Sequence, residues 1–383
     1  MKILITTDLY TVETNGVVTS TKNLVRELKA QGHEVRVLTL SETKHAHKDE
    51  EEGVYFVPSM SFPVYPGVRC PLSLHHKFVK EQVAWKPDVI HSQCEYFSYC
   101  FAKYVSRKTK APIVHTYHTL YEQYAHYVIP IKCISGWVVK TFSRKRLKKA
   151  RVVIAPTYKV EQVLRGYNMK NDIRVVPSGI KLAQHAVRFS AEERASKKQE
   201  LGIPADRKVL LNLGRLGDEK SIDELIRFYA TALKTRDDIH FLIVGGGPAK
   251  ESLEKLAADL GIADRVLFTG MVNPQEVQLY YQLGDLFLSA STSETQGLTY
   301  IEAAANGLPL LCRQDLCLVG VLVEGKNGYE YTDEQSFLEG LDKAFADPDW
   351  CEAAGKESEA IAASFGTAEF GNRVAGICES ILS

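Results

Sequence analysis

Short apolar runs alternate with amphipathic stretches from the first residues of the chain. Residues 2–7, KILITT, form an apolar run of strand length, and residues 16–29 carry apolar positions at helical spacing that end near Gly32. A second apolar run, residues 34–40, follows directly. Because strand, helix and strand in this order form a βαβ unit, we predict a parallel sheet whose ligands bind at the carboxyl ends of its strands.

The same alternation continues and then restarts after a polar segment. Between Pro177 and about Arg207 the sequence turns polar and charged, which we interpret as a link that carries a short helix between two domains. A helix is also predicted over 221–234. Further strands are predicted at 88–91, 112–116, 152–155, 208–213, 240–244, 266–268, 286–289 and 309–311. We therefore predict two doubly wound, Rossmann-like α/β domains, residues 1–180 and 181–364, facing each other across a cleft.

Composition fits this organisation. The 383 residues are 45% hydrophobic and 25% charged, as expected for a globular chain long enough for two domains. The start lacks the pattern of a secretory signal, and no run approaches the roughly 18 apolar residues of a membrane span. We expect a cytosolic protein. The 8 cysteines show neither CxxC pairs nor zinc-ligand spacing, so we expect reduced thiols and no metal site.

The net charge of zero conceals an asymmetry. Residues 1–180 carry 27 Lys and Arg against 15 Asp and Glu, whereas the remainder carries 20 against 32. A basic half is compatible with anionic lipid, with nucleic acid or with a domain interface. Composition alone does not choose among these three.

The most informative segment is residues 289–309, SASTSETQGLTYIEAAANGLP. Glu294 and Glu302 stand eight positions apart, and a loop becomes a helix at Gly297 between them. The first N–H groups of a helix lack intrahelical partners and bind phosphate, while Glu302 lies about 8 Å further along the axis. A nucleotide sugar fits this layout, with its pyrophosphate on the helix end and its hydroxyls on the carboxylates. The alternative is an amphipathic helix with two exposed glutamates.

These residues resemble the EX7E signature of retaining GT-B glycosyltransferases, of the kind called glycosyltransferase family 4, and the resemblance covers nearly the whole chain. It implies that Glu294 contacts the transferred sugar and Glu302 the ribose, with Leu298 and Thr299 at the donor phosphates. It also implies that a helix over 365–383 crosses back to the first domain. Gln296 departs from the Phe common in the family. The segment ETQGLT is most similar to that of the diacylglycerol glucosyltransferases.

A second match lies after the strand at 208–213. Gly214-Arg215-Leu216 with Glu219-Lys220 resembles the GRL…EK element of the family, in which Arg and Lys clamp the diphosphate. Two fixed cations at a strand end offset the charge of a departing nucleotide, a task that a divalent metal performs elsewhere. The alternative reading of Arg215 and Lys220 is ordinary surface cations.

Two glycine turns complete the implied donor site. The resemblance places Gly245, in the Gly-Gly-Gly-Pro turn after the strand at 240–244, beside the nucleotide base, although a simple tight turn explains it equally well. Gly16, which opens the first helix, would permit the backbone to approach the donor phosphates. This role too is implied by the resemblance.

The chemistry that the resemblance implies is front-side substitution, in which a donor phosphate oxygen takes the acceptor's proton. His118 follows a strand and matches the family's histidine at the sugar, where its neutral ring could hydrogen-bond a hydroxyl. A lone histidine in a cleft is often structural. The only DxD pattern, Asp347-Pro348-Asp349, has the context of a turn, so we expect no metal and no other cofactor.

The region 115–151 carries the signal for the acceptor. The phrase HTYHTLYEQYAHY resembles the diacylglycerol glucosyltransferases, and apolar residues including Trp137, Val138 and Phe142 follow it. Apolar groups beside many cations are typical of an interfacial helix on an anionic membrane. The alternative is a core stripe with a solvated charged face; nucleic acid is not expected, since no recognised binding module is present. The proposed membrane cations are Lys132, Lys140, Arg144, Lys145, Arg146, Lys148 and Lys149.

We therefore predict a retaining hexosyltransferase that moves glucose from UDP-glucose to a membrane lipid, 1,2-diacylglycerol, at the inner face of the membrane. One rival keeps the enzyme class and exchanges the lipid for a soluble acceptor. Another is a sugar-nucleotide epimerase or a phosphorylase on the same fold. A third is a membrane-binding protein without catalytic activity.

Overall fold

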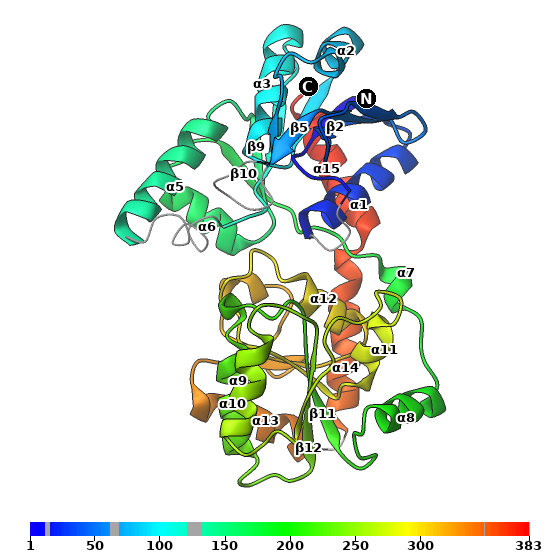
Figure 1. The fold of residues 1–383 in the computed structure, drawn as a ribbon, viewed down its shortest axis with the longest axis vertical. Helices are drawn as coiled ribbons and strands as arrows, with labels where there is room; N and C mark the ends of the chain where they lie inside the picture. The colour runs from blue at the N-terminus through cyan, green and yellow to red at the C-terminus, as the bar shows by residue number, and fades with distance from the viewer. Residues whose placement is uncertain (12–15, 62–68, 121–131, 348, 383) are drawn as a thin grey trace. The chain divides into compact units, whose positions relative to one another are not determined.

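The computed structural model describes residues 1–11, 16–61, 69–120, 132–347 and 349–382, with 132–137 described by their backbone alone (Figure 1). The chain divides into two compact units. Unit 1 comprises residues 1–179 together with 367–383, and unit 2 comprises residues 180–366. Each unit is built around its own sheet.

Unit 1 holds a sheet of eight described strands in the order β10-β9-β8-β7-β1-β2-β4-β3. All neighbours pair in parallel except β3 with β4. The edge strand β3 lies in a charged segment, residues 42–52, whose sequence has no apolar run that would predict a strand. The strands are β1 (Lys2–Thr6), β2 (Glu34–Leu40), β3 (His47–Asp49), β4 (Val54–Val57), β7 (Val89–Ser92), β8 (Ile113–Thr116), β9 (Val152–Ala155) and β10 (Asp172–Val175), with a separate hairpin of β5 (Ser59–Ser61) and β6 (Arg69–Pro71).

Helices cover both faces of this sheet. One apolar core lies beneath α1 and α15, and the other beneath α2, α3, α5 and α6. In Figure 1 the C-terminal helix α15 (red) runs beside α1 (blue), where the Thr367 hydroxyl donates to Glu27 at 2.7 Å. The chain's last helix is thus part of the first unit. The helices are α1 (Gly16–Ala30), α2 (Lys77–Trp85), α3 (Phe97–Thr109), α5 (Lys132–Leu147), α6 (Tyr158–Gly166) and α15 (Thr367–Ser380).

Unit 2 holds a parallel sheet of six described strands in the order β13-β12-β11-β14-β15-β16. Counted within the unit this order is 3-2-1-4-5-6, that of dinucleotide-binding Rossmann sheets. The strands are β11 (Lys208–Leu213), β12 (Ile239–Val244), β13 (Val266–Phe268), β14 (Leu286–Ser289), β15 (Leu310–Arg313) and β16 (Gly328–Tyr331).

The strands of unit 2 are buried on both faces, which explains their continuous apolar sequence. All six residues of β12 are buried, with Phe241 and Ile243 in one core and Leu242 and Val244 in the other. The helices that cover these faces are α7 (Leu182–His185), α8 (Ala191–Glu200), α9 (Ile222–Ala232), α10 (Lys250–Asp259), α11 (Val277–Leu283), α12 (Leu298–Ala305), α13 (Glu334–Ala346) and α14 (Trp350–Ala362), with 3-10 turns η2 (Asp218–Lys220), η3 (Leu316–Leu318) and η4 (Ala363–Phe365).

The polar segment after residue 180, interpreted above as a link, is packed onto unit 2. Helix α8 begins with a capping box between Ser190 and Glu193 and packs against α11. The backbone N–H of Phe189 donates to the Gln282 side chain at 3.0 Å. The polar sequence of this segment therefore reflects a helix, α8, that lies on the surface of a domain.

None of the helices that the structure describes combines the length and apolar character needed to span a membrane. Within the described residues, no group of three or more His, Cys, Asp or Glu side chains is placed to hold a metal ion.

Candidate active site

The strand order of unit 2 reverses between β11 and β14, its first and fourth strands. Open α/β sheets bind ligands outside the carboxyl ends of the strands at such a point. The loops that leave these two strands carry Arg215 and Lys220 on one side and Glu294 and Gly297 on the other. The fold therefore brings together two segments that are some eighty positions apart in the sequence.

The loop after β14 turns sharply into α12 at Gly297. This residue has φ +70°, and a Cβ on it would lie 2.4 Å from the ring of Tyr300. That ring cannot give way easily, because Tyr300 is buried and its hydroxyl is 3.0 Å from the Ser289 hydroxyl. Glycine is thus required at this turn on two counts. Half-buried Leu298 and Thr299 then begin α12, and its N-cap residue, Gly297, has no side chain that could cap the helix.

Lys220 and Glu294 form an ion pair that joins the two loops. A second bond supports the junction, since the Ser293 hydroxyl donates to the Glu219 carbonyl at 3.0 Å. Arg215, more exposed, pairs with the Glu219 carboxylate four positions on. Neither pair is fully buried, with side-chain exposures of 27% for Lys220 and 58% for Arg215, so a ligand with two negative charges can compete for the two cations. The structure brings together Arg215, Lys220 and Glu294, three residues predicted to bind the nucleotide-sugar donor, and adds Glu219 to them.

Glu302 lies on α12 beyond the helix mouth and accepts a hydrogen bond from the Tyr281 hydroxyl at 2.9 Å. Burial raises the pKa of Glu302 from 4.5 to about 7, against the opposing effect of that hydrogen bond. A carboxyl group with this pKa changes its charge near neutral pH. Tyr281, which orients Glu302, was missed by sequence reasoning, because Tyr281 lies 21 positions earlier on a different helix.

The glycines after β12 have a packing role. A Cβ on Gly245 would lie 1.9 Å from the Gly214 carbonyl oxygen, and one on Gly247 would lie 2.2 Å from that of Leu216. The two turns are also hydrogen-bonded, since the N–H of Leu216 donates to Gly246 at 3.0 Å. These glycines thus hold the Arg215 turn in place. The predicted contact of Gly245 with a nucleotide base stays a prediction.

Unit 1 has its own reversal of strand order, between β1 and β7. Asp8 follows β1, Gln93 follows β7 and His118 follows β8, so the three side chains share the carboxyl edge of the sheet. The Ser98 N–H donates to Asp8 Oδ1 at 2.8 Å, and burial raises the Asp8 pKa to about 6. Among the described residues Asp8 Oδ2 and Gln93 Nε2 are buried without a partner. Unsatisfied polar atoms in such a place are suited to binding a ligand.

His118 is held by Gln93, whose side-chain oxygen lies 2.7 Å from His118 Nε2. A carbonyl oxygen only accepts, so Nε2 donates and Nδ1 is left as the acceptor. Burial and nearby His115 lower the pKa of His118 to about 3, which makes the ring neutral at physiological pH. Gln93 could have been found from the sequence by the same rule of strand ends that singled out His118.

Arg146 differs from its neighbours in the basic run. Its guanidinium lies inward from α5 and donates to the Glu95 carbonyl at 2.6 Å and to the Tyr96 carbonyl. It also donates to Cys100 Sγ at 3.1 Å. Arg146 therefore fixes the loop that carries Gln93. By contrast Arg144, Lys145, Lys148 and Lys149 are exposed and Lys140 is half-buried, while the side chain of Lys132 lies outside the described residues.

Some predicted features lie partly outside the residues that the structure describes. Gly16 is exposed at the start of α1, but residues 12–15 before it are not described, nor are 121–131 in the aromatic stretch. The DxD pattern lies between α13 and α14, where the Asp349 N–H donates to the Asp347 carboxylate at 3.0 Å. That bond is typical of a turn.

Two Rossmann-like units in one chain are the architecture of the GT-B glycosyltransferases, and the solved structures that resemble this fold belong to that class. Two family models match the sequence. The model "Glycosyltransferase Family 4" matches residues 14–184, and "Glycosyl transferases group 1" matches residues 193–360. The chain belongs to this glycosyltransferase family and is a nucleotide-sugar-dependent hexosyltransferase.

Similar proteins include two curated enzymes of the same name. The alpha-monoglucosyldiacylglycerol synthase of Streptococcus pneumoniae is 34% identical over 91% of this chain and 79% of its own length. That of Acholeplasma laidlawii is 32% identical over 89% of this chain and 87% of its own. Among solved structures, Anabaena Alr3699/HepE in complex with UDP and glucose superposes with TM-score 0.75 at 17% identity, covering 99% of this chain and 100% of that one. This last likeness concerns the fold.

Proposed function

We propose that this enzyme transfers glucose from UDP-glucose, with retention of configuration, to 1,2-diacylglycerol at the inner face of a membrane. The observation that carries the proposal is the likeness to two alpha-monoglucosyldiacylglycerol synthases over about nine tenths of the chain. The donor loops of unit 2 and an apolar, basic helix in unit 1 support it independently.

The donor binds at the switch point of unit 2. Its diphosphate lies on the N-terminus of α12 at Gly297, Leu298 and Thr299, and Arg215 and Lys220 turn from their carboxylate partners to the phosphates. The released Glu294 then accepts hydrogen bonds from the sugar hydroxyls, and Glu302 accepts them from the ribose. The ion pairs of Arg215 and Lys220 and the hydrogen bond from Tyr281 to Glu302 keep these side chains near their working positions in the free protein.

The reaction breaks the bond between C1 of glucose and the β-phosphate oxygen, and it forms a bond from C1 to the acceptor oxygen on the same face. The acceptor's proton passes to the departing phosphate oxygen, so the products are UDP and the α-glucolipid. Arg215, Lys220 and the helix end stabilise the negative charge that grows on UDP. Neutral His118 positions the sugar through its free Nδ1.

These cations and helix dipole supply the charge stabilisation that a divalent metal gives in other transferases. We therefore propose that the enzyme needs neither metal nor another cofactor. Transfer should continue in a chelator, and loss of activity that added Mg²⁺ or Mn²⁺ restores would contradict this part.

Helix α5 is the proposed membrane contact. Val138 and Phe142, four positions apart on this helix, are 37% and 38% exposed, and exposed Arg144 and Lys145 follow them. An apolar strip beside cations suits the boundary between lipid headgroups and acyl chains. Leu72 and Leu74, 50% and 40% exposed, offer a second apolar contact. Each exposed cation near an anionic surface adds about 1 kcal/mol of binding free energy.

Mass spectrometry of the products tests the proposal. The enzyme is incubated in chelator with UDP-glucose and vesicles that contain diacylglycerol, and we expect UDP and monoglucosyldiacylglycerol. Lys220→Ala removes a cation that stabilises the leaving group, so kcat should fall by at least about 100-fold. Lys234→Ala, a change on the same unit away from the site, is the control.

Other outcomes assign other functions. A glucoside formed only from a soluble alcohol or sugar would replace the lipid acceptor, and turnover of UDP-glucose without any acceptor would favour an epimerase. No UDP release with lipid, soluble acceptor or phosphate present would leave a membrane-binding protein and contradict the proposal.

A further inference from the structure

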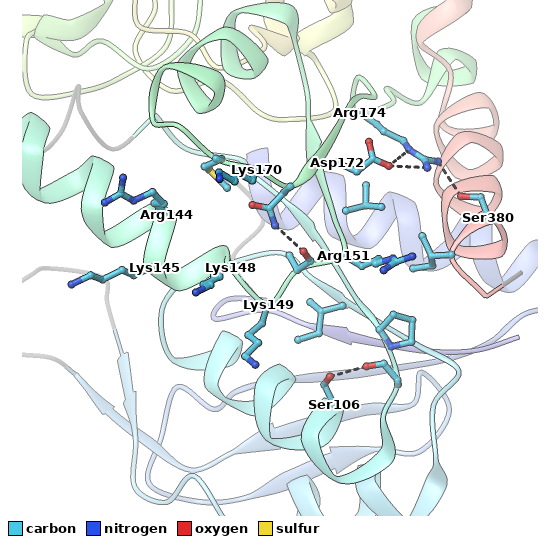
Figure 2. A pocket seen from close by; sticks show the side chains of 18 of the residues that line it. Ser106, Arg144, Lys145, Lys148, Lys149, Arg151, Lys170, Asp172, Arg174 and Ser380 are labelled. Carbon is cyan, nitrogen blue, oxygen red and sulfur yellow. Dashed lines mark hydrogen bonds and ion pairs between the residues drawn. The ribbon is translucent and has the colours of Figure 1, made fainter.

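A hollow in unit 1 is lined by many cations. Its volume is about 1130 Å³, and eight of its lining side chains are Lys or Arg, whereas Asp172 is the single acid among the described lining residues. Figure 2 shows Arg144, Lys145, Lys148 and Lys149 along the end of α5, and Arg151 and Lys170 also line the hollow. Together with Lys110, which follows α3, the cations of residues 144–151 and 170–174 come from three separate chain segments.

The hollow lies at the opposite edge of the sheet from His118. Its floor includes Ile113, Val152 and Asp172, the first residues of the parallel strands β8, β9 and β10. His118, Gln93 and Asp8 all follow carboxyl ends of strands in the same sheet. The cations of the hollow therefore have no part in the candidate active site.

The charges in the hollow are largely uncompensated. Asp172 is engaged by Arg174 at 2.9 Å, and no described carboxylate forms an ion pair with Lys145, Lys148, Arg151 or Lys170. Cations near the C-terminal ends of α3 and α5 are favourable to those helix dipoles, but Lys170 and Arg151 belong to neither helix. Like charges within a Debye length of about 8 Å repel one another, and an anion would relieve that repulsion.

The walls of the hollow are held in place without a ligand. The Asn171 side chain donates to the carbonyls of Leu147 at 3.1 Å and Ala150 at 2.7 Å, which joins the end of α5 to β10. Opposite, the Ser106 hydroxyl donates to the Ala111 carbonyl at 2.7 Å. A site whose frame is already fixed loses little entropy when it binds.

We propose that this hollow binds a terminal phosphate dianion, presented either by a phospholipid headgroup or by a soluble polyphosphate. Several cations lining one hollow suit a compact group with three accessible oxygens and two charges. The neighbouring exposed Val138 and Phe142 favour the lipid source. The inference deepens the proposed membrane association, adding a headgroup site to a general surface attraction.

Two binding measurements on the full-length protein test this. The first is sedimentation with phosphatidylcholine vesicles containing either phosphatidic acid, a monoester, or phosphatidylglycerol, a diester, at matched surface charge. The second is calorimetry with inorganic tripolyphosphate. Lys148→Gln with Lys170→Gln should weaken the preferred binding about 30-fold. The control Lys44→Gln with Lys80→Gln removes the same charge from exposed positions of unit 1 outside the hollow and should bind as the wild type does.

The outcomes separate the sources. Preference for phosphatidic acid, lost in the Lys148/Lys170 variant, identifies the lipid headgroup; tripolyphosphate binding alone, lost in the same variant, identifies a soluble anion. Lys220→Gln, which alters unit 2, reports tripolyphosphate bound there. Equal binding of both vesicles together with no tripolyphosphate binding that the Lys148/Lys170 variant loses, or equal binding by both double variants, overturns the inference.

Glucosyl transfer to diacylglycerol dispersed in neutral detergent keeps this inference separate from the proposed function. The Lys148/Lys170 variant should retain that activity. If the wild-type protein does not transfer glucose to diacylglycerol in detergent, that result would count against the proposed function alone.

Discussion

At the scale of single residues, burial sets the chemistry of the two sites. Glu302 and His118 were chosen from sequence as hydrogen-bonding groups, and their surroundings give each a charge state that the sequence does not specify. Burial leaves His118 neutral, whereas Glu302, beside the Tyr281 hydroxyl, titrates near pH 7.

The raised pKa of Glu302 predicts a stability effect. Since the folded protein binds this proton more tightly than the unfolded chain does, the Glu302 contribution to the free energy of unfolding falls as pH rises from about 4.5 to about 7 and is constant outside that window. Glu302→Gln should remove this slope, as measured by urea denaturation across the window. Parallel pH profiles for wild type and variant would contradict the prediction.

At the scale of elements, α5 has two roles that the linear sequence merges into one basic run. Exposed cations point to a surface, while Arg146 fixes the loop between β7 and α3. In the sequence, the exposed cations and Arg146 all belong to one basic run. Only the contacts that each face of α5 makes show which of these residues are structural.

Replacing Arg146 and replacing Arg144, two arginines of α5, should therefore have different effects. Arg146→Met leaves the carbonyls of Glu95 and Tyr96 without their donor and should cost about 2 kcal/mol of stability and lower kcat, with vesicle binding little changed. Arg144→Met should weaken vesicle binding and leave kcat in detergent and the urea midpoint unchanged. Arg146→Lys, with the charge but not the fork of donors, should recover only part of kcat. Identical behaviour of both methionine variants would show that Arg146 has no positioning role.

At the scale of the whole molecule, the last helix belongs to the first unit. Alongside Ala375, four larger buried side chains of α15 enter the core beneath α1, namely Phe370, Val374, Ile377 and Cys378. The backbones also approach closely, since a Cβ on Gly371 would lie 2.6 Å from Glu27 Cβ. Unit 1 is therefore completed by a helix that follows unit 2 in the sequence.

A chain that ends at residue 366 should lose unit 1 selectively. Removing four buried side chains at about 1.5 kcal/mol or more each costs about 6 kcal/mol, comparable with the stability of a whole domain. Hydrogen exchange followed by mass spectrometry should show fast exchange in β1, β2 and β7 and protection in β11 and β14. Arg373→Ala, on the exposed face of α15, is the control and should leave both units protected; protected β1 in the shortened chain would refute the prediction.

Much of the architecture was predictable because parallel strands buried on both faces leave apolar runs that can be read directly. The sequence also located the loops after β11 and β14, since the rule of strand ends applies to any doubly wound sheet. No strand was predicted at β4, β10 or β16 or in the β5–β6 hairpin. Two further elements show why a sequence pattern can mislead. The charged edge strand β3 pairs on one side only and carries no apolar pattern, and polar α8 has the composition of a linker although it packs on unit 2.

The sequence by itself determined the two α/β units, the helix mouth at Gly297 and the acidic and basic residues around it, because periodicity and glycine requirements are local. Only the tertiary structure decided which of these charges meet. The pairing of Lys220 with Glu294, the orientation of His118 by Gln93 and the gathering of cations at one edge of unit 1 all join segments distant in the chain. Such contacts depend on strand order, and strand order leaves no local trace in the sequence.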